Sequence, residues 1–176
     1  MPPPPMYRNL RVDPPELHKA DYAVLYLGSR LPCVAVECGV LAAHGTGVFS
    51  YHEDKAKAYQ VARYTFDKPA IFLPIDDIHN HDVLMADDVL DSAFEGDYDP
   101  YQALGLDLFQ RYGQVIHGLS WASYHRGKTG RVFALWHHHK ATIGLGVTTT
   151  SFNALSADPE FEGFLAKHPT LLRLAS

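Results

Sequence analysis

Residues 31–44, LPCVAVECGVLAAH, decide the prediction of the fold, because they read as a helix with a carboxylate on its apolar side. At about 3.6 residues per turn, the side chains that share one stripe with Glu37 are Cys33, Val34, Val40 and Leu41. A glutamate on a helix ordinarily faces water. Here we expect it on the dry face, either as a paired structural carboxylate or as part of a pocket floor, with the helix ending at Gly45.

The flanking segments alternate between short strands and helices, which predicts an α+β fold built on a mixed sheet of short strands with flanking helices. We expect a single domain over residues 7–176, after a flexible proline-rich lead-in at residues 1–6. The expected helices are the one just described, one from Asp99 to Gly113 and one over residues 158–167. The expected strands cover residues 22–27, 58–65, 70–75, 115–122 and 131–136.

Composition limits the classes of function. The 176 residues are 47% hydrophobic and 20% charged, with a net charge of -5, which is ordinary for a globular domain. No basic block predicts direct nucleic-acid binding, and no apolar run reaches the ~18 residues of a membrane span. The N-terminus has no apolar core of a signal peptide, and we expect Cys33 and Cys38 to be reduced, buried and unreactive in the cytoplasm.

Four residues are candidates for chemistry, each with a plain structural alternative. Glu37 is the charged group of the apolar stripe, and Tyr26 stands at the end of the strand that leads into that helix. Ser123, in GLSWASYH, follows a strand and enters a glycine-bearing loop, without the Gly-x-Ser-x-Gly pattern of a hydrolase nucleophile. Arg11, in YRNLRVDPP, could hold a diphosphate by bidentate contacts or be a solvated charge.

The histidines offer a different chemistry. If the strand over residues 131–136 continues, His137 and His139 point the same way, as two metal ligands would. His79 and His81 could add a further ligand. No His-Glu-x-x-His helix or cysteine pair completes such a site, so we expect no metal.

Taken in order, three stretches resemble the RES domain, the toxin half of RES–Xre toxin–antitoxin systems. They are LRVDPP with Arg11, VLYLGSRLPCVAVECGVL with Tyr26 and Glu37, and GLSWASYHRGKTGRVFALW with Ser123. The resemblance covers roughly residues 8–136. It departs from the family at Trp121, where tyrosine is common, and at Leu10-Arg11-Val12, where the family has Gly-Arg followed by an aromatic residue.

The resemblance implies a fold like that of ADP-ribosyltransferases and cleavage of the nicotinamide–ribose bond of NAD, which is the substrate. Hydrolysis, phosphorolysis and ADP-ribosyl transfer all remain open. In this scheme Glu37 stabilises an oxocarbenium-like transition state. Tyr26, Ser123 and Arg11 bind NAD at its nicotinamide ring, its ribose or amide, and its diphosphate. The resemblance also implies an Xre-type antitoxin as partner, in a hetero-oligomer without direct nucleic-acid or membrane contact.

Two alternatives come from other classes of function. One is a metal-dependent small-molecule enzyme that uses His137 and His139. The other is a binding module that keeps the fold and binds NAD without turnover.

Overall fold

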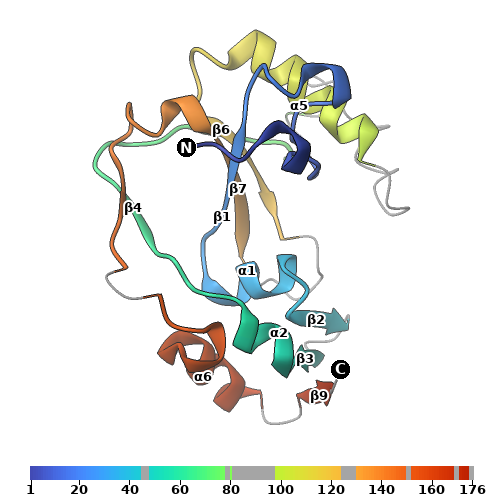
Figure 1. Ribbon diagram of the computed structural model, residues 1–176, viewed down its shortest axis with the longest axis vertical. Coiled ribbons are helices and arrows are strands. Elements are labelled where there is room, and N and C mark those ends of the chain that lie inside the picture. The colour runs from blue at the N-terminus through green and yellow to red at the C-terminus, as the bar shows by residue number, and fades with distance from the viewer. Residues whose placement is uncertain are drawn as a thin grey trace. The chain divides into compact units, whose positions relative to one another are not determined.

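The computed structural model describes residues 1–44, 48–77, 80, 98–123, 130–149, 152–168 and 171–174 (Figure 1). The chain divides into two compact units. Unit 1 comprises Met1–Leu27, Phe66–Trp121 and Phe133–Gly144, and unit 2 comprises Gly28–Thr65, Ala122–Val132 and Leu145–Ser176. Helices and strands alternate along the chain, which confirms the α+β class. Folding as one domain, with the fold of ADP-ribosyltransferases, stays a prediction.

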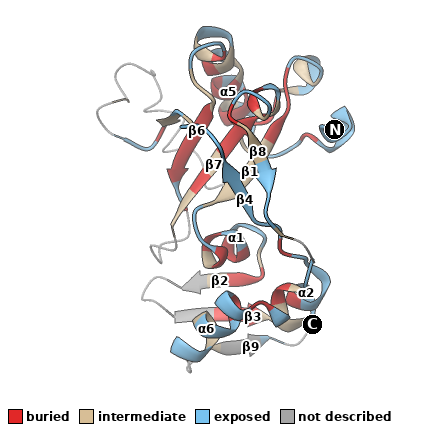
Figure 2. Ribbon diagram, turned by 90° about the vertical axis from the view of Figure 1, so that its left-hand side faces the viewer, coloured by how far each residue is buried: buried red, intermediate tan, exposed pale blue. Residues whose placement is uncertain are grey.

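A four-stranded sheet, most of whose residues belong to unit 1, has the strand order β1-β7-β6-β5. Its strands are β1 (Val24–Gly28), β7 (Arg131–Trp136), β6 (Gly118–Ala122) and β5 (Phe72–Pro74). The inner strands β6 and β7 carry most of the buried residues of the sheet, as Figure 2 shows in red. The predictions of strands over residues 22–27, 70–75, 115–122 and 131–136 are therefore confirmed, with shifts at their ends.

Helix α5 (Asp99–Tyr112) belongs to unit 1, and its buried apolar residues include Tyr101, Leu104 and Leu108. Pro100 occupies the first turn, where a missing N–H costs nothing, and Gly113 caps the C-terminus, so the predicted bounds are confirmed. The ring of Phe109 stacks on Tyr22 at 4.4 Å and meets Trp136 edge-on at 5.4 Å between centroids. These contacts join the helix to β7 and to the segment that precedes β1.

In unit 2, a three-stranded sheet joins β2 (Leu41–His44), β3 (Val48–His52) and β9 (Leu172–Leu174). β3 is the middle strand, antiparallel to β2 and parallel to β9. The helices of this unit are α1 (Leu31–Glu37), α2 (Glu53–Ala58) and α6 (Pro159–Lys167). One apolar core joins them, and its largest buried members are Leu41, Tyr51 and Phe161.

The predicted helix over residues 31–44 is wrong beyond Glu37. α1 ends there, and Gly39 takes a positive φ of 66°, which glycine adopts without strain. Its N–H still bonds to the carbonyl of Val36, and the chain then turns into β2, whose backbone groups pair with β3 instead of continuing the helix. Gly45, the expected end, lies outside the described residues.

The predicted strand over residues 58–65 is also largely wrong. Only β4 (Tyr64–Phe66) is a strand there, and it pairs with β8 (Leu145–Val147). Upstream, the chain forms the short helix α2 and one isolated bridge from Gln60 to Ala154. The apolar residues of this segment alternate too weakly to distinguish a strand from a helix end.

The predicted helix over residues 158–167 is confirmed as α6. Asp158 is the N-cap of this helix, and its carboxylate accepts a hydrogen bond of 3.0 Å from the N–H of Glu160. The same carboxylate forms a bidentate ion pair with Arg63 at 2.8 and 2.9 Å. Among the described residues, none of the helices is both long and apolar enough to cross a membrane.

Candidate functional site

Glu37 and Ser123 meet in unit 2 through a direct hydrogen bond. The Oγ of Ser123 donates to the Oε1 of Glu37 over 2.8 Å, although the residues are 86 positions apart. Ser123 follows β6 and is only 8% exposed, and its backbone N–H bonds to the carbonyl of Gly130. Two of the four residues chosen from the sequence are therefore brought together.

Glu37 is exposed, so the expectation that it lies on the dry face of its helix is wrong. The buried residues of α1 are instead Leu31, Cys33, Ala35 and Val36. The stripe drawn from the sequence needed Val40 and Leu41 on the same helix, and these two lie beyond its end. Glu37 is the last residue of α1, with one oxygen held by Ser123 and the other making no hydrogen bond to a described residue.

The two cysteines lie near this carboxylate as free thiols. Cys33 is fully buried and donates to the carbonyl of Arg131 at 3.5 Å. Burial raises its pKa to about 11; a hydrogen bond with Ser123 opposes this shift in part, and the charge of Glu37 adds a smaller increase. Cys38 is exposed, contrary to expectation, and desolvation of its thiol and the Glu37 charge also raise its pKa. Both are therefore thiols at neutral pH.

Arg11 and Tyr26 belong to unit 1, where they contact a common aromatic group. The guanidinium of Arg11 lies 5.2 Å from the ring centre of Tyr101 and 6.0 Å from that of Trp121. The ring of Tyr26 meets Trp121 edge-on at 6.4 Å. Tyr101 and Trp121 were not among the predicted site residues, although the aromatic position two residues before Ser123 could have indicated Trp121.

The hydroxyl of Tyr26 is fixed by two partners. It accepts a hydrogen bond of 3.1 Å from the N–H of Val12 and bonds to the carboxylate of Asp13. Burial, and then the charge of Asp13, raises the pKa of Tyr26 well above its ordinary value. The phenol is therefore neutral and already hydrogen-bonded, which leaves its ring as the part available to a ligand.

The histidine run does not continue the strand as the metal hypothesis required. β7 ends at Trp136, and His137–His139 form a short 3-10 turn. The Nε2 atoms of His138 and His139 both bond to the carbonyl of Gly113, at 3.2 and 2.8 Å. Within the described ranges, no group of three or more His, Cys, Asp or Glu residues is placed to hold a metal ion, while His79 and His81 lie outside those ranges.

Comparison with protein-family models, with curated proteins and with solved structures finds no significant match to this chain. What the fold and the site define is a small α+β protein. It has an exposed carboxylate oriented by a serine in unit 2 and an arginine–aromatic cluster in unit 1.

Proposed function

We propose that this protein is a RES-type toxin that cleaves the nicotinamide–ribose bond of NAD by hydrolysis, phosphorolysis or ADP-ribosyl transfer. The observation that carries the proposal is the 2.8 Å hydrogen bond from Ser123 to Glu37. Glu37 and Ser123 were selected as candidates from two stretches that lie far apart in the sequence, and they form a direct polar contact within one unit. A single site that uses both residues requires such a contact.

Glu37 would supply the charge for the reaction. Breaking the bond at the anomeric carbon builds positive charge on the ribose, and a carboxylate fixed beside it lowers the energy of that state. Because Glu37 is exposed, water surrounds its carboxylate in the free protein, and NAD would displace that water when it binds. Its second oxygen is then available to the ribose hydroxyls.

Ser123 would orient the carboxylate in the free protein. Its hydroxyl donates its single hydrogen to Oε1 of Glu37, and the hydroxyl oxygen can still accept a hydrogen bond from the nicotinamide amide or the ribose. Because Ser123 is held by its backbone bond to Gly130, it limits the freedom of the Glu37 side chain. Orientation before binding reduces the entropy lost in the reaction.

Arg11 and Tyr26 would bind NAD without taking part in bond breaking. The guanidinium of Arg11, which lies against two aromatic rings, suits the diphosphate. The ring of Tyr26 would stack on or orient the nicotinamide. We further propose an Xre-type antitoxin as partner, in a hetero-oligomer, and a cytoplasmic location.

A second candidate is a module that binds NAD without turning it over. The exposure of Glu37 favours it, because a carboxylate in water stabilises a nearby cation much less than one in a dry pocket. The two candidates differ in product formation and not in binding.

The deciding experiment measures NAD consumption by the purified full chain, with and without phosphate, and separates the products by chromatography. Wild type should release nicotinamide, and Glu37→Gln should lower the rate by about 10²–10³-fold. Glu162→Gln, which removes the same charge from an exposed position on α6, should retain the wild-type rate. Undiminished turnover by Glu37→Gln would refute the mechanism, and NAD binding without product would favour the second candidate.

A further inference from the structure

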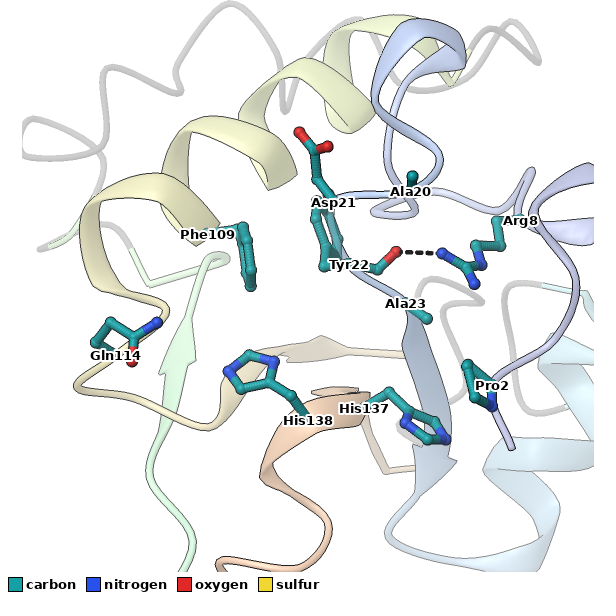
Figure 3. Close-up of a pocket in the computed structure, with 10 residues that line it drawn as sticks. All are labelled: Pro2, Arg8, Ala20, Asp21, Tyr22, Ala23, Phe109, Gln114, His137 and His138. Atoms are coloured by element: carbon teal, nitrogen blue, oxygen red, sulfur yellow. Dashed lines mark hydrogen bonds between the residues drawn. The ribbon is translucent and has the colours of Figure 1, made fainter.

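Unit 1 contains a pocket of about 300 Å³ that is not lined by Glu37, Tyr26, Ser123 or Arg11, the four candidates for NAD cleavage. Its wall includes Arg8, Asp21, Tyr22, Phe109, His137 and His138 (Figure 3). These residues come from the N-terminal segment, from α5 and from the turn after β7. The volume is at the small end for ligand pockets and suits a small molecule.

Arg8 is the charged residue that defines this pocket. It is only 8% exposed. Its Nε donates to the carbonyl of Pro3 at 3.0 Å, and its Nη1 donates to the carbonyls of Lys19 and Tyr22, the latter at 2.8 Å. Figure 3 draws the bond to Tyr22. Nη2 makes no hydrogen bond to a described residue, and no carboxylate of the described residues forms an ion pair with this guanidinium. A buried cation that carbonyls solvate but no anion neutralises is costly to keep.

The charged groups around the pocket are of both signs. Burial lowers the pKa of His137, and the charges of Lys140, the N-terminal amine and Arg8 lower it further. The carboxylate of Asp21 is 2.7 Å from Nδ1 of His18, and its charge still acts on the pocket wall, because it adds to burial and to the charge of Asp13 in raising the pKa of Tyr22. Asp13 interacts with Arg8 only beyond ion-pair distance, and its carboxylate accepts a hydrogen bond from the N–H of Leu10. The positive groups that act on the wall are therefore Arg8, Lys140 and the N-terminal amine, against the carboxylates of Asp13 and Asp21.

The remaining wall is aromatic. The rings of Tyr22 and Phe109 stack with an interplanar angle of 23°, and His138 meets Phe109 edge-on with centroids 5.7 Å apart. Burial also lowers the pKa of His138, so this ring is neutral at pH 7. Flat uncharged rings favour an apolar, planar body in the ligand.

We propose that this pocket binds a small oxyanion that carries a flat ring, with its carboxylate or phosphate group near Arg8 and its ring against Phe109 and His138. The proposal goes beyond NAD cleavage and does not depend on it. The two N–H groups of Nη2, which the carbonyls leave unused, can donate to either kind of oxyanion.

The test titrates the full chain with four probes while NMR follows the ring signals of His137 and His138, assigned with His137→Gln and His138→Gln. Benzoate and phenyl phosphate carry a ring and an oxyanion, benzyl alcohol lacks the charge, and acetate lacks the ring. At least one of the first two should shift both signals, raise the pKa of His137 and bind at least about tenfold more tightly than benzyl alcohol or acetate. Which of the two binds better identifies the oxyanion.

Two charge variants complete the test, one at Asp21 in the pocket wall and one at Lys140, whose charge acts on His137. Arg8→Gln would also remove three backbone contacts, so the charge is changed at Asp21 and Lys140 instead. Asp21→Asn should tighten binding of the oxyanion by about two- to fivefold, and Lys140→Gln should weaken it by a similar factor. Lys167→Gln, on α6, makes the same charge change as Lys140→Gln at a residue whose charge is not among those that act on His137, and it should leave binding unchanged. No shift of either histidine signal, equal binding of benzyl alcohol, or unchanged binding in both Asp21→Asn and Lys140→Gln would each overturn the proposal.

Discussion

The hydroxyl of Ser123 holds one oxygen of Glu37 at 2.8 Å, and this bond joins the end of α1 to the residue that follows β6. The other oxygen of the same carboxylate stays accessible, since Glu37 is exposed. One side of the group is therefore fixed and the other is open to a ligand. A carboxylate held in this way can contact a substrate and loses little side-chain freedom when it does so.

Replacing Ser123 with alanine should lower NAD-cleaving activity by about tenfold or more while leaving the protein folded. The variant frees the Glu37 carboxylate to rotate and removes the hydrogen bonds of the hydroxyl with Glu37 and Cys33, each of which stabilises the fold by only about 0.5–1.5 kcal/mol. Steady-state kinetics should show the loss in kcat more than in KM, and urea unfolding should show the small change in stability.

Ser123→Thr is the matched control for that substitution, because it keeps a hydroxyl at the same position. It should recover much of the activity that Ser123→Ala loses. Equal losses in the two variants would show that the volume of the side chain, and not the hydrogen bond to Glu37, decides the effect.

Much of the sheet of unit 1 could be predicted from the sequence because its strands are short apolar runs between turn residues. RVFALW at residues 131–136 is β7 with the same bounds, and Pro100 and Gly113 marked both ends of α5. The secondary-structure predictions fail where hydrogen bonding between strands, and not the local sequence pattern, decides the structure. LAAH at residues 41–44 is compatible with a helix, and it becomes β2 because Gly39 turns the chain toward β3.

The site was predicted only in part, for a related reason. The pairing of Glu37 with Ser123 depends on a contact across 86 positions, which no periodicity reports. The exposure of Glu37 followed from the early end of α1, so the desolvation argument built on a longer helix does not hold. Trp121 and Asp13, which hold Tyr26, and the pocket around Arg8 come from packing between segments that the sequence does not show as neighbours.

The two cysteines should react with thiol reagents at very different rates. Cys33 is fully buried and its pKa is raised to about 11, whereas Cys38 is exposed. A chromogenic disulfide reagent at pH 8 should therefore modify one thiol in the native protein and the second only after unfolding in urea. The native rate should increase as the pH rises, since the thiolate is the reactive form.

Cys38→Ser checks the assignment of the reactive thiol. This variant should show no fast-reacting group in the native state and one group after unfolding. Fast modification of native Cys38→Ser would mean that Cys33 is accessible, contrary to its burial.

Asp158 should stabilise the fold above acidic pH. Its hydrogen bonds and ion pair with Arg63 lower its pKa below the ordinary value, so the folded state favours the charged carboxylate. That contribution is complete above the unfolded pKa of about 3.9 and disappears as the pH falls through the lower folded pKa. Asp158→Asn, which can still cap α6, should cost about 1–3 kcal/mol at pH 7 and clearly less at pH 3, by urea unfolding.

The exposed pair of Arg111 and Asp107 on α5 provides the comparison for Asp158. Asp107→Asn removes the same charge from an ion pair that water screens, and it should change stability by no more than about 0.5 kcal/mol. If both variants cost the same at pH 7, the burial of Asp158 contributes nothing to its effect.

Two glycines should respond in opposite directions when they are replaced by alanine. A Cβ at Gly118 in β6 would lie 2.1 Å from the carbonyl oxygen of Ala134 in β7, so the two backbones would have to separate. Gly118→Ala should therefore cost about 3 kcal/mol or more. A Cβ at Gly163 meets nothing within 4 Å, and this residue lies inside α6, where alanine favours the helix by about 0.5–1 kcal/mol. Thermal unfolding should show a lower Tm for the first variant and a higher Tm for the second. A stable Gly118→Ala would mean that β6 and β7 do not approach each other at this position.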